Sequence, residues 1–241
     1  MAPIGKIYTY PENPRAQKVR RAGAATPRRC KADSTQVHAA ARINGLEVEE
    51  VPGFAMGKTN KTPEFLAKFP TGKVPAFEGA DGLNLLESDA IMQYVAESGP
   101  KAAQLVGGTA AEKARVQQWV FFQMGEVWPE VLKLLYPRFG FTKYDDAVEL
   151  PALSKLGKAL DTVEAGLAGG KKWLATDALS IADLAVMSAF VWAFKFGVDE
   201  EMRNKYPTAI DWFLRTLRSD GVQQSFPNAE KEMCAVRQIP Q

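Results

Sequence analysis

The sequence predicts a mixed α/β domain followed by an all-helical domain, and two patterns support this division. Up to residue 98, short strand-like runs alternate with helical runs in the order β-α-β-α-β-β-α. The segment Ser98-Gly99-Pro100 then interrupts the pattern, and the later apolar repeats have helical spacing. We therefore expect one domain over residues 1–98 and a second over residues 105–241.

The elements of the first domain follow from apolar patterning and from the positions of proline and glycine. A helix should begin near residue 16, and Pro63 suits the first turn of another. The turn over residues 79–82 predicts a hairpin. We expect strands at 6–10, 46–51, 75–78 and 83–86, and further helices at 63–69 and 88–97.

The second domain contains a strong helix-start signal at Ser180. Asp183, three residues later, can reach back to the Ser180 N–H, and Leu179 and Leu184 occupy the positions of a hydrophobic staple. The helix that follows is apolar nearly all round, so we expect it to be central. Further helices are expected from residue 116, over 145–167, and from Pro207.

Composition excludes several classes of protein. The chain has 241 residues, 46% hydrophobic and 24% charged, which fits a globular protein. It contains no apolar run of membrane-spanning length and no signal-peptide core, so we expect a cytoplasmic protein. Two cysteines and one histidine argue against a disulfide framework and against a metal site. A net charge of +2 makes nucleic acid an unfavoured partner, although residues 21–31 are basic.

The run Val74-Pro75-Ala76-Phe77 places a proline at the start of a strand. Proline cannot donate to a sheet ladder, and here, often with a cis bond, it would leave the N–H and C=O of Val74 free for a ligand. Downstream, Glu87-Ser88 stands where a helix begins, and unpaired N–H groups there favour a carboxylate. Together these features predict a site for a small peptide.

These motifs resemble the glutathione transferase family. The residues that carry the resemblance are Val74-Pro75, Glu87-Ser88 and the Ser180/Asp183 pair. Runs at 7–13 (I-Y-T-Y-P-E-N), 59–66 (T-N-K-T-P-E-F-L) and 68–79 (K-F-P-T-G-K-V-P-A-F-E-G) are similar to the N-terminal domain of translation elongation factor 1B-gamma. The resemblance implies a thioredoxin-like α/β domain followed by an all-α domain, the glutathione transferase fold.

The resemblance also implies glutathione as ligand or substrate, with no metal. Val74-Pro75 would pair with its cysteinyl main chain, or would form a structural turn. Ser88 would take the γ-glutamyl carboxylate and Glu87 the amine, or the pair would be an ordinary helix cap. Lys73 would meet the glycine carboxylate, or would be a solvated lysine.

A transferase must also hold the glutathione thiol as a thiolate, and the sequence leaves that residue open. The turn after the first strand contains no serine or cysteine. Tyr8 and Asn13 are the catalytic candidates, with Thr9 and Tyr10 as alternatives; Tyr8 and Tyr10 share one strand face. The alternative for each tyrosine is simple packing. Trp119, Trp128, Trp192 and Phe196 would line a pocket for an apolar electrophile or, more simply, pack in the core.

Two departures from the family pattern affect the functional prediction. Residues 21–38 interrupt the first helix with Gly23 and Pro27, so we expect a solvated inserted loop, a translated intron being one origin. The family's gamma subunit continues into a further domain, whereas this sequence ends at Gln241. Two functions are therefore predicted: a scaffold, as a homodimer, for the exchange subunit of elongation factor 1B, or a free-standing transferase.

Overall fold

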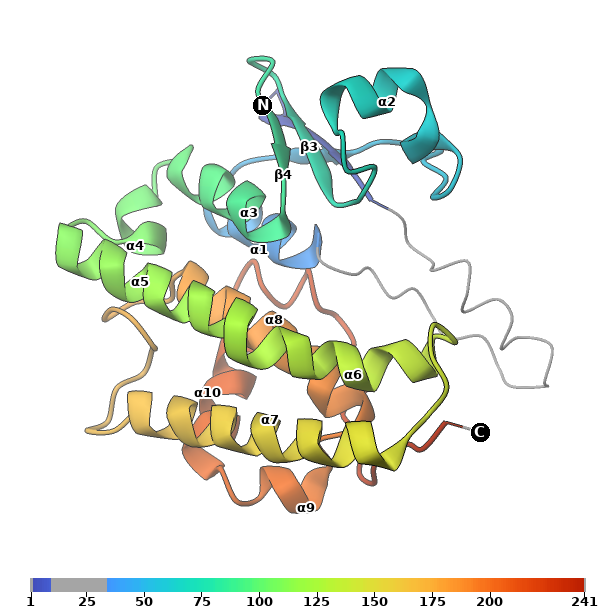
Figure 1. Ribbon diagram of the computed structural model, residues 1–241. Helices are drawn as coiled ribbons and strands as arrows, with labels where there is room; N and C mark the ends of the chain where they lie inside the picture. Colours follow the sequence, from blue (N-terminus) through green and yellow to red (C-terminus); the bar gives the residue numbers. More distant parts are fainter. Residues whose placement is uncertain (1, 10–33, 241) are drawn as a thin grey trace.

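The computed structural model describes residues 2–9 and 34–240. Within them a four-stranded sheet has the order β2-β1-β3-β4 (Figure 1). β1 (Gly5–Tyr8) pairs in parallel with β2 (Val48–Glu50) and antiparallel with β3 (Ala76–Gly79), and β3 pairs antiparallel with β4 (Asn84–Leu86). The predicted hairpin is confirmed, with β3 shifted by one residue from the expected 75–78 and β4 one residue shorter than the expected 83–86.

The two faces of this sheet are covered differently, because side chains alternate along each strand. Ile7 and Phe77 face α1 (Ser34–Ile43) and α3 (Ser88–Glu97) and join the large core. Tyr8 and Ala76 face the opposite way, toward α2 (Pro63–Lys68), which follows the short helix η2 (Thr59–Lys61). The α1–α3 layer therefore lies between the sheet and the rest of the molecule (Figure 1).

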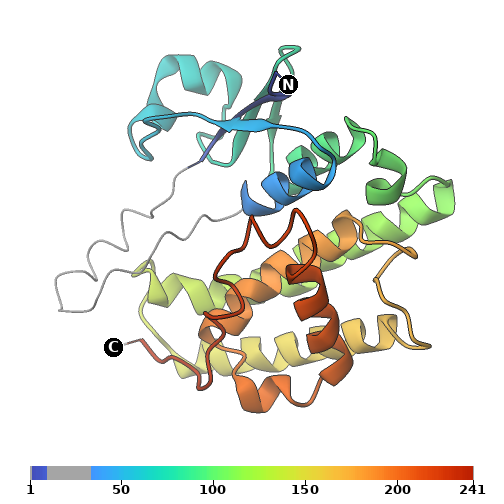
Figure 2. The same cartoon turned by 180° about the vertical axis from the view of Figure 1, so that it is seen from behind.

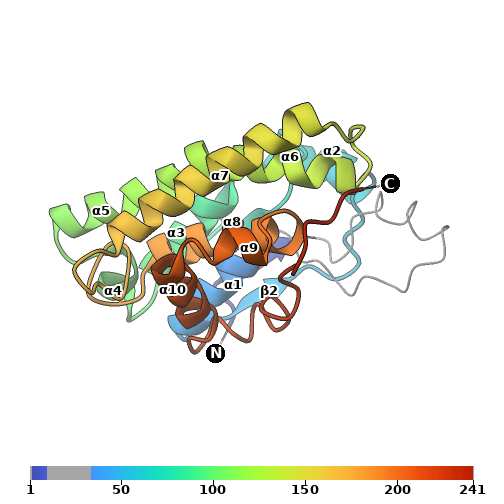
Figure 3. The ribbon, with the colours of Figure 1, turned by 90° about the horizontal axis from the view of Figure 1, so that it is seen from below.

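The second part of the chain is helical throughout its regular elements. α8 (Ile181–Phe196) is central (Figure 3). Phe190 and Phe194 on it are fully buried. The surrounding helices are α4 (Ala102–Val106), α5 (Ala110–Phe122), the π-helical η3 (Gln123–Val127), α6 (Trp128–Arg138), α7 (Asp146–Gly166), α9 (Glu200–Arg203) and α10 (Pro207–Leu217). This architecture confirms the predicted fold class, an α/β domain followed by an all-α domain.

The start of α8 is organised by Asp183, as the sequence predicted. Its fully buried carboxylate accepts hydrogen bonds from the Ser180 N–H (3.0 Å), the Ser180 hydroxyl (3.0 Å), the Leu174 N–H (3.0 Å) and the Trp212 indole (2.8 Å). Burial raises the pKa of this carboxyl above its ordinary value, while the four donors oppose the rise. Asp183 thus fixes the approach to α8 against α10.

The segment after α10 returns to the α/β domain (Figure 2). Arg42 at the end of α1 donates to the Ser225 hydroxyl (2.6 Å), and Val222 is fully buried. Within the described residues no helix combines the length and apolar character needed to cross a membrane. The same part of the chain holds no group of three or more His, Cys, Asp and Glu side chains suited to a metal ion.

One sequence expectation needs correction. Residues 34–38, which the sequence predicts to belong to the inserted loop, form the first half of α1. The reason is burial: Val37 is fully buried in the main core together with Ala40 and Ala41, which lie three and four residues further on, on the same side of a helix. The rest of the expected insertion, and the expected helix start at Ala16, lie outside the described residues.

Candidate glutathione site

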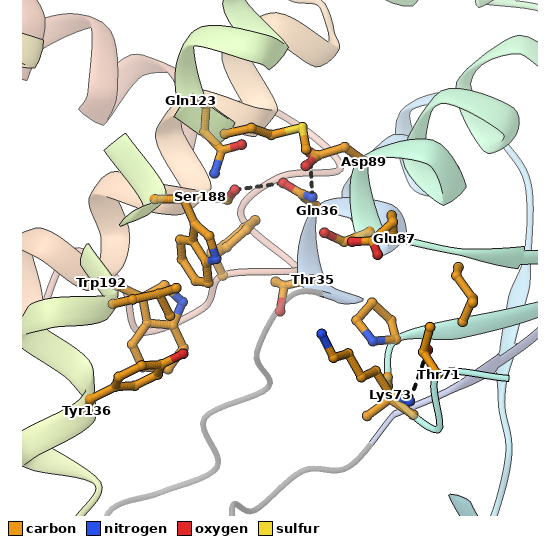
Figure 4. Close-up of a pocket in the computed structure, with 18 residues that line it drawn as sticks. Thr35, Gln36, Thr71, Lys73, Glu87, Asp89, Gln123, Tyr136, Ser188 and Trp192 are labelled. Carbon is orange, nitrogen blue, oxygen red and sulfur yellow. Dashed lines mark hydrogen bonds between the residues drawn. The ribbon is translucent and has the colours of Figure 1, made fainter. Parts of the chain in front are cut away.

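A pocket of about 350 Å³ lies between the α/β domain and the helical domain (Figure 4). The α/β domain contributes the segment before β3, the β4–α3 junction and the start of α1. The helical domain contributes η3, α6 and α8, and Phe226 comes from the segment after α10. The five residues predicted to bind glutathione all line this pocket: Lys73, Val74, Pro75, Glu87 and Ser88.

The strand-edge wall consists of Lys73, Val74 and Pro75. The Val74–Pro75 peptide bond is cis, as the sequence suggested, and Pro75 is buried while Lys73 is exposed. β3 begins only at Ala76, and the main chain of Val74 forms no hydrogen bond to another described residue. Its N–H and C=O thus remain available to an extended ligand, which is how a peptide adds to a sheet edge.

The helix-start wall is built by Glu87 and Ser88. α3 begins at Ser88, so the unpaired N–H groups of its first turn lie at this wall. Glu87, the residue before it, has φ 66°, ψ 121°. This backbone conformation is unfavourable for a residue with a side chain, and such strain is found preferentially at functional sites. The geometry combines an anion-accepting helix start with an exposed carboxylate.

A hydrogen-bonded chain of three side chains connects this wall to the helical domain. Gln36 Nε2 on α1 donates to Asp89 Oδ1 (3.0 Å), and the Ser188 hydroxyl on α8 donates to Gln36 Oε1 (2.7 Å) (Figure 4). Burial raises the pKa of Asp89 to about 6; the charge of Glu87 adds to the rise, and the Gln36 hydrogen bond opposes it. The pocket therefore holds a carboxyl that titrates near neutral pH.

The opposite wall is apolar and aromatic. Trp128, Leu132, Tyr136 and Trp192 line it from α6 and α8, and Met124 and Phe226 extend it. The sequence is compatible with either a pocket role or a core role for Trp119, Trp128, Trp192 and Phe196. Trp128 and Trp192 line the pocket, whereas Trp119 is buried and donates from its indole to Leu174 O (3.0 Å). The ring of Phe196 stacks on that of Trp192 with 6.2 Å between the ring centroids, and Phe196 does not line the pocket.

The structure does not bring the first catalytic candidate, Tyr8, to the pocket. Its ring packs against Phe54, Phe65 and Phe69 on the far side of the sheet, and its hydroxyl donates to Glu78 Oε2 (2.9 Å). Burial, aided by Glu78, raises the pKa of Tyr8 to about 12. Asn13, the second candidate, lies outside the described residues, as does Tyr10.

Sequence reasoning missed several pocket residues. Asp89 could have been found, because it follows Glu87 and Ser88 directly in the first turn of the predicted helix. Thr35 and Gln36 were not predicted as pocket residues, because the sequence predicts that they belong to the inserted loop. Gln123 and Phe226 carry no local signal, since only tertiary packing brings them to the pocket.

Comparison with known proteins finds relatives over nearly the whole chain. Residues 29–97 match the family profile of the glutathione S-transferase N-terminal domain, and residues 127–220 match that of the C-terminal domain. The chain is 45% identical to the glutathione S-transferase-like protein LUC7 of Fusarium sp over 226 residues, 94% of each chain. It is 33% identical to elongation factor 1-gamma of Homo sapiens, covering 88% of this chain but 44% of that protein.

Solved structures with a similar fold include both kinds of protein. The GST-like domain of elongation factor 1-gamma from Saccharomyces cerevisiae superimposes with a TM-score of 0.77 at 21% identity, covering 100% of both chains. Glutathione S-transferase I from maize, in complex with an atrazine glutathione conjugate, superimposes with a TM-score of 0.74 at 28% identity. That comparison covers 95% of this chain and 99% of the maize chain.

Proposed function

Because the chain belongs to the glutathione S-transferase family, we propose that it binds glutathione in this pocket and joins the glutathione sulfur to small electrophiles. The Val74 main chain pairs with the cysteinyl unit of the tripeptide. Ser88 and the start of α3 take the γ-glutamyl carboxylate, and Glu87 and Asp89 take its ammonium group. Lys73 meets the glycine carboxylate.

One observation carries this proposal: segments 73–75 and 87–89 meet at one pocket, and their charges complement the tripeptide. Glutathione has a carboxylate at each end and an ammonium group at its γ-glutamyl end. Lys73 and Glu87 lie at different ends of the wall contributed by the α/β domain (Figure 4). The cysteinyl unit, between the two ends of the tripeptide, would then face the aromatic wall.

The reaction needs the glutathione sulfur as a thiolate, and a hydroxyl that donates a hydrogen bond to it favours that form. Thr35 is the candidate: it is buried at the start of α1 and lines the pocket beside Lys73 (Figure 4). With an aryl halide the thiolate attacks the ring carbon that carries the halogen. A C–S bond forms, the halide leaves with the bonding pair, and the thiol proton passes to solvent.

The relatives support this reading over the other predicted function. The Fusarium relative, which shares nearly its full length with this chain, is a glutathione S-transferase-like protein. The maize structure, similar over nearly the whole chain, contains a glutathione conjugate. The two comparisons span 94% and 95% of this chain.

The test measures glutathione affinity by calorimetry and conjugation of chlorodinitrobenzene by absorbance. Ser88→Ala should weaken glutathione binding about tenfold, because it removes a hydrogen bond to a charged group. Ser98→Ala is the matched control, since Ser98 lies at the other end of α3 and its hydroxyl donates to Tyr94 O. Unchanged affinity in Ser88→Ala would remove the helix-start wall from the site.

The role of Thr35 is tested separately by Thr35→Val and Thr35→Ser. Valine keeps the shape but removes the hydroxyl, so turnover should fall at least about tenfold while glutathione affinity changes little. Serine should retain most of the activity. Full activity in Thr35→Val would place the activating group elsewhere.

A second candidate function is a scaffold for the exchange subunit of elongation factor 1B, with the chain as a cytoplasmic homodimer. The similarity to elongation factor 1-gamma in both sequence and fold favours it. Light scattering of the purified chain, alone and mixed with the purified exchange subunit, tests both parts of this proposal. A monomeric mass and no complex would leave the transferase function alone.

A further inference from the structure

Gln123 has an unusual position at the boundary between the two halves of the pocket. It is the first residue of the π-helical turn η3, which joins α5 to α6. Such turns widen a helix locally and are frequent at functional sites. Gln123 lines the pocket together with Met124 and Trp128, and its amide is directed into the pocket toward the side of Ser188 (Figure 4).

The amide oxygen of Gln123 is buried without a partner. The residue is 6% exposed, yet its Oε1 accepts no hydrogen bond from any of the described residues. Burying an unpaired carbonyl costs free energy, and a leucine or methionine would fill the same space without that cost. A glutamine whose buried amide oxygen has no partner is explained if a bound ligand donates a hydrogen bond to that oxygen.

The neighbouring polar side chains Ser188 and Gln36 do not donate a hydrogen bond to Gln123 Oε1. The single hydroxyl proton of Ser188 is donated to Gln36 Oε1, with Ala185 O as its alternative acceptor, and Gln36 Nε2 donates to Asp89. These groups are engaged with one another in the hydrogen-bonded chain described above. The other side chains that the helical domain contributes to the pocket include Trp128, Leu132 and Trp192, which suit a flat apolar molecule.

We infer that the second substrate of this site is a planar, apolar electrophile bearing a hydroxyl or N–H group, which donates a hydrogen bond to Gln123 Oε1. This inference rests on the proposed function, because it places the second substrate beside the glutathione subsite. The aromatic wall binds the ring system, and Gln123 selects among such molecules. A site built to accept a hydrogen bond discriminates strongly against an analogue without the donor.

The experiment compares naphthol with methoxynaphthalene, which has the same ring system but no donor. Affinities are measured by tryptophan fluorescence quenching, since Trp128 and Trp192 line the pocket. The native chain should bind naphthol about tenfold more tightly than methoxynaphthalene. Gln123→Met should remove that preference by weakening naphthol binding, and should leave methoxynaphthalene binding unchanged within about twofold.

Gln117→Met is the matched control, because Gln117 lies on the preceding helix and its amide donates to Gln93 instead of lining the pocket. It should keep the naphthol preference. A second probe pair, naphthylamine and its dimethylated form, repeats the comparison in the native chain and needs no folded variant. Equal affinities within both pairs, or a preference that survives in Gln123→Met, would overturn the inference.

Glutathione affinity is measured on the same proteins, so that the two proposals can fail separately. If the native chain binds no glutathione but discriminates between the naphthalenes through Gln123, the transferase proposal fails and the hydrogen-bond assignment stands. If it binds glutathione but shows no discrimination, only the substrate inference fails. Gln123→Met should also raise the midpoint of thermal unfolding without ligand, because it removes an unpaired buried carbonyl.

Discussion

Gln36 Nε2 donates a hydrogen bond of 3.0 Å to Asp89 Oδ1, and this contact joins α1 to the first turn of α3 at the pocket. The bond stabilises the ionised carboxylate, but burial has the larger effect and raises the pKa of Asp89 to about 6. The folded protein therefore binds a proton at Asp89 more tightly than the unfolded chain does. This difference links the stability of the protein to pH.

Asp89→Asn should change how stability depends on pH. Because the folded pKa is raised, the native protein loses stability as pH rises from about 4 to about 6, and the neutral asparagine does not. We expect the variant to gain about 1–2 kcal/mol relative to the native chain between pH 4 and pH 7, the full linkage being reduced by partial solvent access. Urea unfolding of both proteins at several pH values measures this difference. If the free energy of unfolding depends on pH in the same way in the variant and in the native chain, the prediction is wrong.

Glu87→Gly should make the protein more stable and weaken glutathione binding. Glycine adopts φ 66°, ψ 121° without steric cost, so the strain at this position is relieved. Glycine also makes the unfolded chain more flexible, which offsets part of the relieved strain. The net gain in the free energy of unfolding should be about 1 kcal/mol. Loss of the carboxylate should reduce glutathione affinity by about tenfold.

Thermal unfolding and calorimetry test the two effects of Glu87→Gly on the same sample. Glu97→Gly, at the last residue of α3, is a control for replacing a glutamate at a helix end by glycine, because Glu97 has an ordinary helical conformation. It should lower stability, because glycine in a regular helical position is unfavourable. If Glu87→Gly also lowers stability, the backbone at Glu87 is not strained.

The sequence predicted those parts of the site that depend on local chemistry. Val74-Pro75 and Glu87-Ser88 each carry their own signal, a proline at a strand start and a serine at a helix start, and both line the pocket. In the second domain, Ser180 and Asp183 likewise predicted the start of α8. These elements depend on residues only a few positions apart.

What the sequence did not predict depends on packing between distant elements. Alternation placed Tyr8 and Tyr10 on one strand face but did not say which face would meet the helical domain. In the structure Ile7 and Phe77 take that side, and Tyr8 joins the cluster beneath α2. Gln123 was missed for a related reason, because it is one of several polar residues along this helical stretch and nothing in the sequence marks it as the one that faces the pocket.

Asp183→Ala should be strongly destabilising, because it leaves three buried donors without an acceptor: the Trp212 indole and the N–H groups of Leu174 and Ser180. The expected loss is about 3–5 kcal/mol in the free energy of unfolding. Glu112→Ala is the matched control, since Glu112 caps α5 with Thr109 in the same sequence pattern but on the surface. Urea denaturation should show a much smaller loss there, and similar losses in the two variants would contradict the network at Asp183.

Tyr8→Phe should leave conjugation activity within about twofold of the native value, because the Tyr8 ring and hydroxyl lie on the sheet face opposite the pocket layer. Its effect should be on stability: the hydroxyl donates to Glu78, which also accepts a hydrogen bond from Lys68, and losing the tyrosine donor should cost about 1 kcal/mol. Turnover of chlorodinitrobenzene and thermal unfolding, measured together, separate the two roles. A large loss of turnover at unchanged stability would return Tyr8 to the catalytic candidates, since packing alone would not produce that result.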